Sequence, residues 1–220
     1  MRPMPSFLRL LVCVLATGAA RGGELGVAVR DRTGLAVQYA VVLLDPAVSE
    51  APRRAPPVSA VVDQKDKQFH PWVLAVSVGA AVSFANHDDI THHVYSFSPA
   101  KRFSYRLQTG EVQGPLAFDA PGVVVLGCNI HDWMVGYLFV TDAPRFLVSD
   151  ATGHARFTEL GAGEWRVRVW HPGLAEDAAR YDQQVTIVGD GAARVEVRFA
   201  TSLRETGPRH PLESGSYHGP

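Results

Sequence analysis

Three side chains that bind soft transition metals lie within seven residues of one another. They are the thiol of Cys128, the imidazole of His131 and the thioether of Met134. A second source of imidazole, the pair His92-His93, lies on a distant part of the chain. One cysteine, two histidines and a weakly bound methionine form the ligand set of a blue-copper centre. The residue types therefore predict a copper site that takes its fourth ligand from this histidine pair.

The cellular compartment that the sequence predicts bears on the role of Cys128. The only other cysteine, Cys13, lies in a segment typical of a secretory signal, where Arg2 and Arg9 precede a short apolar stretch and small residues follow. We expect cleavage after Ala20 and a periplasmic mature protein. A lone thiol in an oxidising compartment must be buried, reactive or bound to metal. A buried structural cysteine is the alternative at this point.

Short β-strands must position these residues. Runs of alternating residues, broken by Gly, Pro, Asp and Asn, recur along the chain and predict an all-β protein made of sandwiches. One such run, 123–126, leads into Cys128, and another, 137–140, follows the ligand loop. A hairpin of these strands would direct the loop ligands toward one point. His92 and His93 are neighbours on an extended segment, so they point to opposite faces and only one can bind the same ion.

The middle of the chain, residues 58–142, resembles the small cupredoxins, most closely amicyanin and less closely plastocyanin. Asn86 lies six residues before His92, and the loop has the short Cys-x2-His-x2-Met spacing found in amicyanin. The resemblance implies a Greek-key β-sandwich, copper as the cofactor, and His92 in preference to His93 as the fourth ligand. It also implies single-electron transfer between redox partner proteins, which the sequence does not identify. His131 would be the partly exposed exit for the electron.

Three positions depart from the cupredoxin pattern. His93 stands where the family usually has asparagine, and Asn129 follows the cysteine where the family usually has serine or threonine. Asp132 adds negative charge beside the exit histidine. Groups around the ligands tune a metal site substantially. We therefore expect an unusual spectrum and reduction potential.

The flanking segments resemble a second kind of sandwich. Residues 24–56 and 143–201 resemble two halves of a carboxypeptidase regulatory-like (transthyretin-like) β-sandwich, because the stretch 26–34 is followed by a strand at 40–44 and the stretch 149–157 leads to 160–167. That family is non-catalytic, which implies scaffolding or binding. We expect the copper domain to be inserted in, or flanked by, this sandwich. The tail, 202–220, is rich in Gly, Pro, Ser and His and is predicted to be disordered.

Other polar residues receive plainer interpretations. Asp88-Asp89 is expected to form a solvated turn and not a carboxylate pair for acid–base catalysis. His171, which precedes Pro172, is interpreted as a turn residue. The only helical candidate is weak and covers 174–181.

Composition and motifs exclude several functions. A formal net charge of −1 without a basic block argues against nucleic acid and anionic membrane surfaces as partners. The apolar run near the N-terminus is too short to span a bilayer. We find no nucleophile elbow and no phosphate-binding loop, so we expect no enzyme. Two alternatives to electron transfer stay open: copper binding for tolerance or delivery, and an adhesion or interaction module with a relic site.

Overall fold

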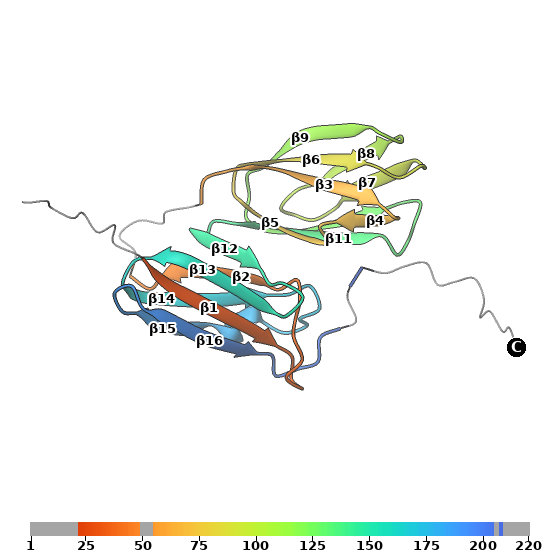
Figure 1. The fold of residues 1–220 in the computed structure, drawn as a ribbon. Helices are drawn as coiled ribbons and strands as arrows, with labels where there is room; N and C mark the ends of the chain where they lie inside the picture. The colour runs from red at the N-terminus through yellow and green to blue at the C-terminus, as the bar shows by residue number, and fades with distance from the viewer. Residues whose placement is uncertain (1–21, 49–54, 205–206, 209–220) are drawn as a thin grey trace, which may run out of the picture.

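The part of the chain that the structure describes forms sixteen β-strands and one short 3₁₀ helix (Figure 1). The computed structural model describes residues 22–48, 55–204 and 207–208. Their strands form four sheets, which pair into two sandwiches. The all-β sandwich class predicted from the sequence is confirmed. The predicted signal peptide, and most of the predicted disordered tail, lie outside the described residues.

The first sandwich contains both ends of the described chain. One sheet has the strand order β13-β1-β16 and the other the order β12-β2-β14-β15. The first strand pairs antiparallel with β13 and parallel with the last strand, so the two flanking segments hydrogen bond to each other. The bounds are β1 Gly23–Arg30, β2 Val41–Pro46, β12 Arg145–Val148, β13 His154–Leu160, β14 Gly163–Trp170, β15 Gln183–Ile187 and β16 Ala192–Arg198.

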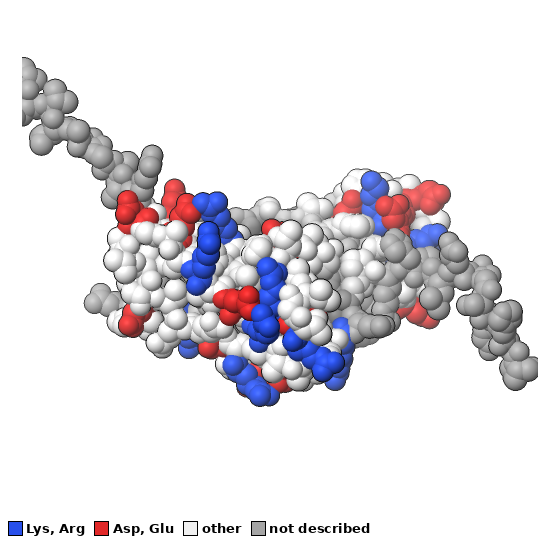
Figure 2. Space-filling view, turned by 60° about the horizontal axis from the view of Figure 1, so that its bottom comes forward, with Lys and Arg blue, Asp and Glu red and all other residues white. Residues whose placement is uncertain are grey.

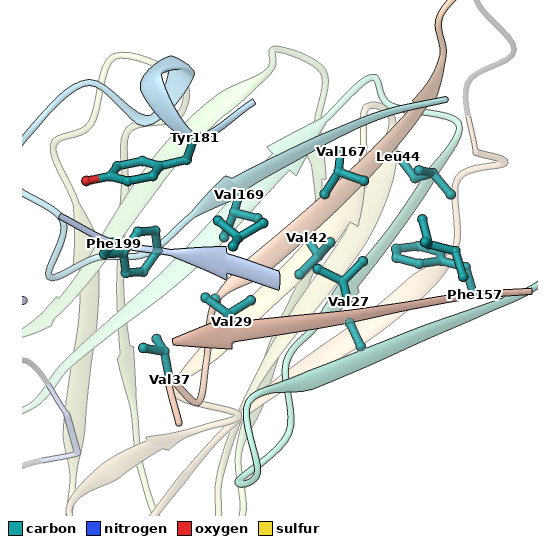
Figure 3. Packing of buried hydrophobic residues seen from close by; sticks show 14 of the residues in the cluster. Val27, Val29, Val37, Val42, Leu44, Phe157, Val167, Val169, Tyr181 and Phe199 are labelled. Carbon is teal, nitrogen blue, oxygen red and sulfur yellow. The ribbon is translucent and has the colours of Figure 1, made fainter. Parts of the chain in front are cut away.

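Alternation along these strands builds the first core. The burial pattern of β1 alternates strictly, and its buried residues Val27 and Val29 face Val42 and Val169 from the opposite sheet (Figure 3). Apolar burial of this kind stabilises by about 25 cal/mol for each Å² removed from water.

The second sandwich is formed by the middle of the chain. Its sheets have the orders β4-β3-β6-β9 and β5-β11-β10-β7-β8. Its core includes Cys128 and Met134 together with Phe84, Leu126 and Leu138. Two of the predicted ligands, Cys128 and Met134, therefore belong to a packed core. The bounds are β3 Ser59–Lys65, β4 Gln68–His70, β5 Val73–Ser77, β6 Ala80–Asn86, β7 His92–Ser96, β8 Phe103–Leu107, β9 Val112–Phe118, β10 Gly122–Cys128 and β11 Val135–Thr141.

A third apolar cluster joins the two sandwiches. Val41 and Leu43 of β2 turn their side chains away from the first core, and Tyr137 and Phe139 of β11 turn away from the second. All four belong to one cluster around Trp72, which is only 4% exposed. Figure 1 shows the corresponding sheets facing each other, with β2 and β12 toward β5 and β11. Both inner sheets are thus covered on two sides at this contact.

The helical prediction is wrong over most of its length. A 3₁₀ helix covers only Ala178–Tyr181, with the Asp177 side chain accepting from the Ala179 amide. The residues before it turn instead, and the Leu174 amide donates to the His171 carbonyl at 3.0 Å. Among the described residues, no helix is long or apolar enough to cross a membrane.

Charged side chains are mixed on the face drawn in Figure 2. Lysine and arginine lie there among aspartate and glutamate, without a field of one sign. Oppositely charged groups pair in several places, such as Arg168 with Asp45 at 2.7 Å. This face offers no continuous basic stripe of the kind that binds nucleic acid.

Candidate metal centre

The hairpin of β10 and β11 positions the ligands of the loop. Cys128 ends β10, and Gly127 just before it pairs with Val135 at the start of β11. Between the two strands, the Met134 amide donates to the His131 carbonyl at 2.9 Å and closes a turn. The tight loop therefore folds His131 and Met134 back over the end of the strand that carries the cysteine.

The strand beside this hairpin supplies His92. Strand β7 pairs antiparallel with β10, and Val94 lies opposite Cys128. Residues two apart on a strand share a face. His92 and Val94 are both buried, at 0% exposure, on the face toward the core. The register of two strands thus brings together a histidine and a cysteine that are far apart in sequence.

His93 lies on the other face of β7. Its Nδ1 accepts a hydrogen bond from the Asn129 side-chain amide at 2.8 Å, and its Nε2 lies 3.0 Å from the Ser104 hydroxyl. The opposite orientation of the two histidines, which the sequence predicts, is what the structure has. The two unusual residues, His93 and Asn129, bind each other on the outside of the sheet.

Three donor atoms converge. The Sγ of Cys128 lies 3.7 Å from the Nδ1 of His92 and 3.9 Å from the Nδ1 of His131. The three atoms all lie within 4.8 Å of one another. In a trigonal site, bonds of about 2.3 Å to sulfur and about 2.0 Å to nitrogen would separate sulfur from each nitrogen by about 3.7 Å. The observed distances therefore suit one shared ion.

The site is closed to bulk water over most of its surface. His92 is 0% exposed, Cys128 4% and His131 8%. His131 is thus more buried than the partly exposed exit residue that the sequence predicts, although Ile130 beside it is 52% exposed. Met134 is 1% exposed in the same core, and its role as an axial ligand stays a prediction.

The surroundings of Cys128 favour its thiolate. Burial raises the pKa of this thiol, but hydrogen bonds with His92 and with the amides of His93 and Ile130 lower it from 9.0 to about 6. Burial lowers the pKa of His92, but its contacts with Cys128 and Asp88 raise it above its ordinary value. The thiolate is the form that binds metal. The surroundings of Cys128 therefore favour the form of the sulfur that binds metal, even without the metal.

The prediction of a solvated turn at Asp88 is wrong. Its side chain is 11% exposed, and its Oδ2 accepts a hydrogen bond from the Nε2 of His92 at 2.6 Å. Of the two aspartates, it is Asp89 that is exposed. A histidine that binds metal commonly donates its other ring N–H to a carboxylate or carbonyl. A carboxylate four residues before a predicted ligand was therefore a usable signal.

Comparison with known proteins gives a partial likeness. No protein-family model matches the chain, and no curated protein matches it by sequence. Solved structures that match include a purple cupredoxin from Nitrosopumilus maritimus, 25% identical over 37% of this chain and 99% of that one, with a TM-score of 0.34. Amicyanin from Paracoccus versutus is 17% identical over 44% of this chain and 97% of its own, with a TM-score of 0.35.

A larger protein also matches in part. A Cu-containing nitrite reductase from Thermus scotoductus SA-01 is 27% identical, with a TM-score of 0.36. The match covers 44% of this chain and 25% of the reductase. Each of these three matches spans less than half of the present chain.

Proposed function

We propose that this chain is a blue-copper protein that carries single electrons between partner proteins. His92, Cys128 and His131 would be its main ligands and Met134 a weak axial one. The observation that carries the proposal is the convergence of one sulfur and two Nδ1 atoms, at 3.7 and 3.9 Å, in a buried site. Copper, when bound, supplies a one-electron couple that none of these side chains has by itself.

The chain holds its donors in place. Cys128 and His92 lie on hydrogen-bonded strands whose inner face is packed into the second core. Packed cores resist rearrangement. One set of donor positions can therefore serve both oxidation states, which favours rapid gain and loss of an electron. The edge of His131, beside the exposed Ile130, is the proposed point of contact with partners.

Copper titration of the purified protein tests the proposal. We expect one equivalent of Cu(II) to bind and to produce the intense visible absorption of a copper–thiolate bond. Voltammetry should then show a reversible one-electron wave. Cys128→Ser should lose the absorption, whereas His93→Gln, a matched control on the outer face of β7, should keep it.

Other outcomes would point elsewhere. Colourless binding of copper at several positions would favour copper tolerance or delivery over electron transfer. A protein that binds no stoichiometric copper would be the interaction module with a relic site. Colour that survives in Cys128→Ser would overturn the ligand assignment.

We also propose where the protein acts and that it is not an enzyme. The features of residues 1–20 support export to the periplasm. Fractionation of cells that express the full chain tests this, and intact protein in the cytoplasm would contradict it. We propose that the chain catalyses no reaction of its own and acts only with a redox partner.

A further inference from the structure

Asp88 forms a bridge between the predicted copper site and a distant hairpin. Its Oδ2 accepts from the Nε2 of His92 at 2.6 Å and from the Lys67 amide at 2.9 Å, while its Oδ1 accepts from the Asp66 amide at 2.6 Å. The carboxylate thus has three donors around it. Only 11% of the Asp88 side chain is exposed, so water competes little with the carboxylate for these three donors.

We propose that Asp88 is a positioning residue that fixes the orientation and tautomer of His92 and lowers the reduction potential of the copper site. This inference rests on the proposed copper function. A hydrogen on Nε2 leaves Nδ1 with its lone pair free, and Nδ1 is the atom that lies beside Cys128. A charged acceptor on the far nitrogen also makes the ring a stronger donor to metal.

The effect on potential follows from charge. An ionised carboxylate hydrogen-bonded to a ligand stabilises the more positive oxidation state more than the less positive one, because Coulomb attraction grows with charge. Cu(II) is therefore favoured over Cu(I). Burial strengthens the interaction, since His92 itself is 0% exposed.

The backbone around Asp88 is built to hold it. Asp66 and Lys67 both have positive φ, at 54° and 56°, in the two-residue turn between β3 and β4. Positive φ at both central residues is typical of a type I′ hairpin turn, and in this conformation the amides of Asp66 and Lys67 both point at the Asp88 carboxylate. On the other side, the Asp88 amide donates to the Oδ1 of Asn86, which is 0% exposed. The Asn86 Nδ2 in turn donates to the carbonyls of Ile90 and Leu107. The carboxylate therefore has little freedom to turn away.

The matched variants are Asp88→Asn and Asp89→Asn. The first removes the charge and keeps the shape; the second removes the same charge from an exposed neighbour. We expect Asp88→Asn to bind copper with the visible absorption retained but shifted, and to weaken Cu(II) binding about tenfold relative to Cu(I). For a one-electron couple this raises the potential by about 59 mV. Asp89→Asn should change the reduction potential much less. Asp88→Glu keeps the negative charge and should have a potential closer to the wild-type value than that of Asp88→Asn.

A measurement on the unmodified protein guards against a variant that does not fold. In the Cu(I) form, nitrogen NMR of the ring of His92 should show a protonated Nε2 that is protected from solvent exchange. A rapidly exchanging or unprotonated Nε2 would overturn the proposal. So would equal potentials for wild type, Asp88→Asn and Asp89→Asn. Failure of the wild type to bind copper would instead reject the proposed function, so the two failures are distinguishable.

Discussion

The indole of Trp72 packs edge-on against the ring of Tyr137, with the ring centroids 5.3 Å apart. Tyr39 of the other sandwich meets the same indole at 5.0 Å. Trp72 is therefore one of several aromatic side chains that join the two sandwiches, as Trp170 does against Phe139 at 5.0 Å. Aromatic pairs of this kind contribute about 0.5–1.5 kcal/mol beyond the area they bury.

Truncation of Trp72 should destabilise the protein strongly. We expect Trp72→Ala to lower the free energy of unfolding by about 3–5 kcal/mol, because it leaves a cavity where the sandwiches meet. Phe97→Ala is the control, since Phe97 is 74% exposed, and it should cost less than about 1 kcal/mol. Denaturant unfolding measures both. Similar losses in the two variants would show that the contact between sandwiches contributes little.

A methyl group at Gly136 should disturb the metal centre. An added Cβ would lie 2.9 Å from the Cβ of Phe69, which is 1% exposed and cannot move aside. We expect Gly136→Ala to cost about 1–3 kcal/mol and to shift the copper spectrum. At Gly127 the added Cβ would meet the end of the partly exposed Tyr95 ring at 2.7 Å, and that ring can swing outward. Gly127→Ala should therefore have the smaller effect on thermal unfolding.

The two adjacent histidines should behave differently. We expect His92→Ala to lose the copper–thiolate absorption and most of the affinity, because it removes a buried donor 3.7 Å from the sulfur. His93→Ala should bind copper with the absorption retained, since its ring bonds to Asn129 on the outer face. Competition titration against a chelator of known affinity checks this. Loss of binding in His93→Ala alone would reverse the assignment.

Acid should destabilise the fold through His171. Burial lowers the pKa of this side chain from 6.5 to about 4. Between these two pH values His171 binds a proton in the unfolded chain but not in the folded chain. The free energy of unfolding is therefore not reduced by this group above pH 6.5, and it falls as the pH is lowered from 6.5 toward 4. The shift corresponds to roughly 3 kcal/mol. His171→Gln should flatten this part of the pH dependence of unfolding. An unchanged slope would show that other groups cause it.

Local patterns predict most of the strands, and loop spacing predicts the donors Cys128 and His131. Alternation along a strand places His92 and His93 on opposite faces, but only the resemblance to cupredoxins favours His92 as the ligand. Strand β9, Val112–Phe118, is not predicted because Gly114-Pro115 interrupts it in sequence. Proline is tolerated there since β9 is the edge strand of its sheet. Edge position is a property of the whole sheet, which no local pattern contains.

Long-range contacts account for the remaining errors. His171 is part of a turn, as predicted, but it is only 4% exposed and lies near Trp72. Trp72 belongs to the second sandwich, so this neighbour of His171 is supplied by a contact between the sandwiches. Asp88 was predicted to be solvated because its role depends on amides of a hairpin more than twenty residues earlier. The contact of Asp88 with His92 is local in sequence, but the backbone amides that hold Asp88 are distant, as Trp72 is from His171.

The pairing of the first strand with the last sets an order of events. As the chain emerges with its N-terminus first, β1 must wait for both of its neighbours, β13 and β16, until nearly all of the protein has been made. The strands of the middle sandwich all lie within residues 59–141 and can close earlier. Distant pairings form slowly. The outer sandwich should therefore be completed last, around a middle sandwich that is already folded.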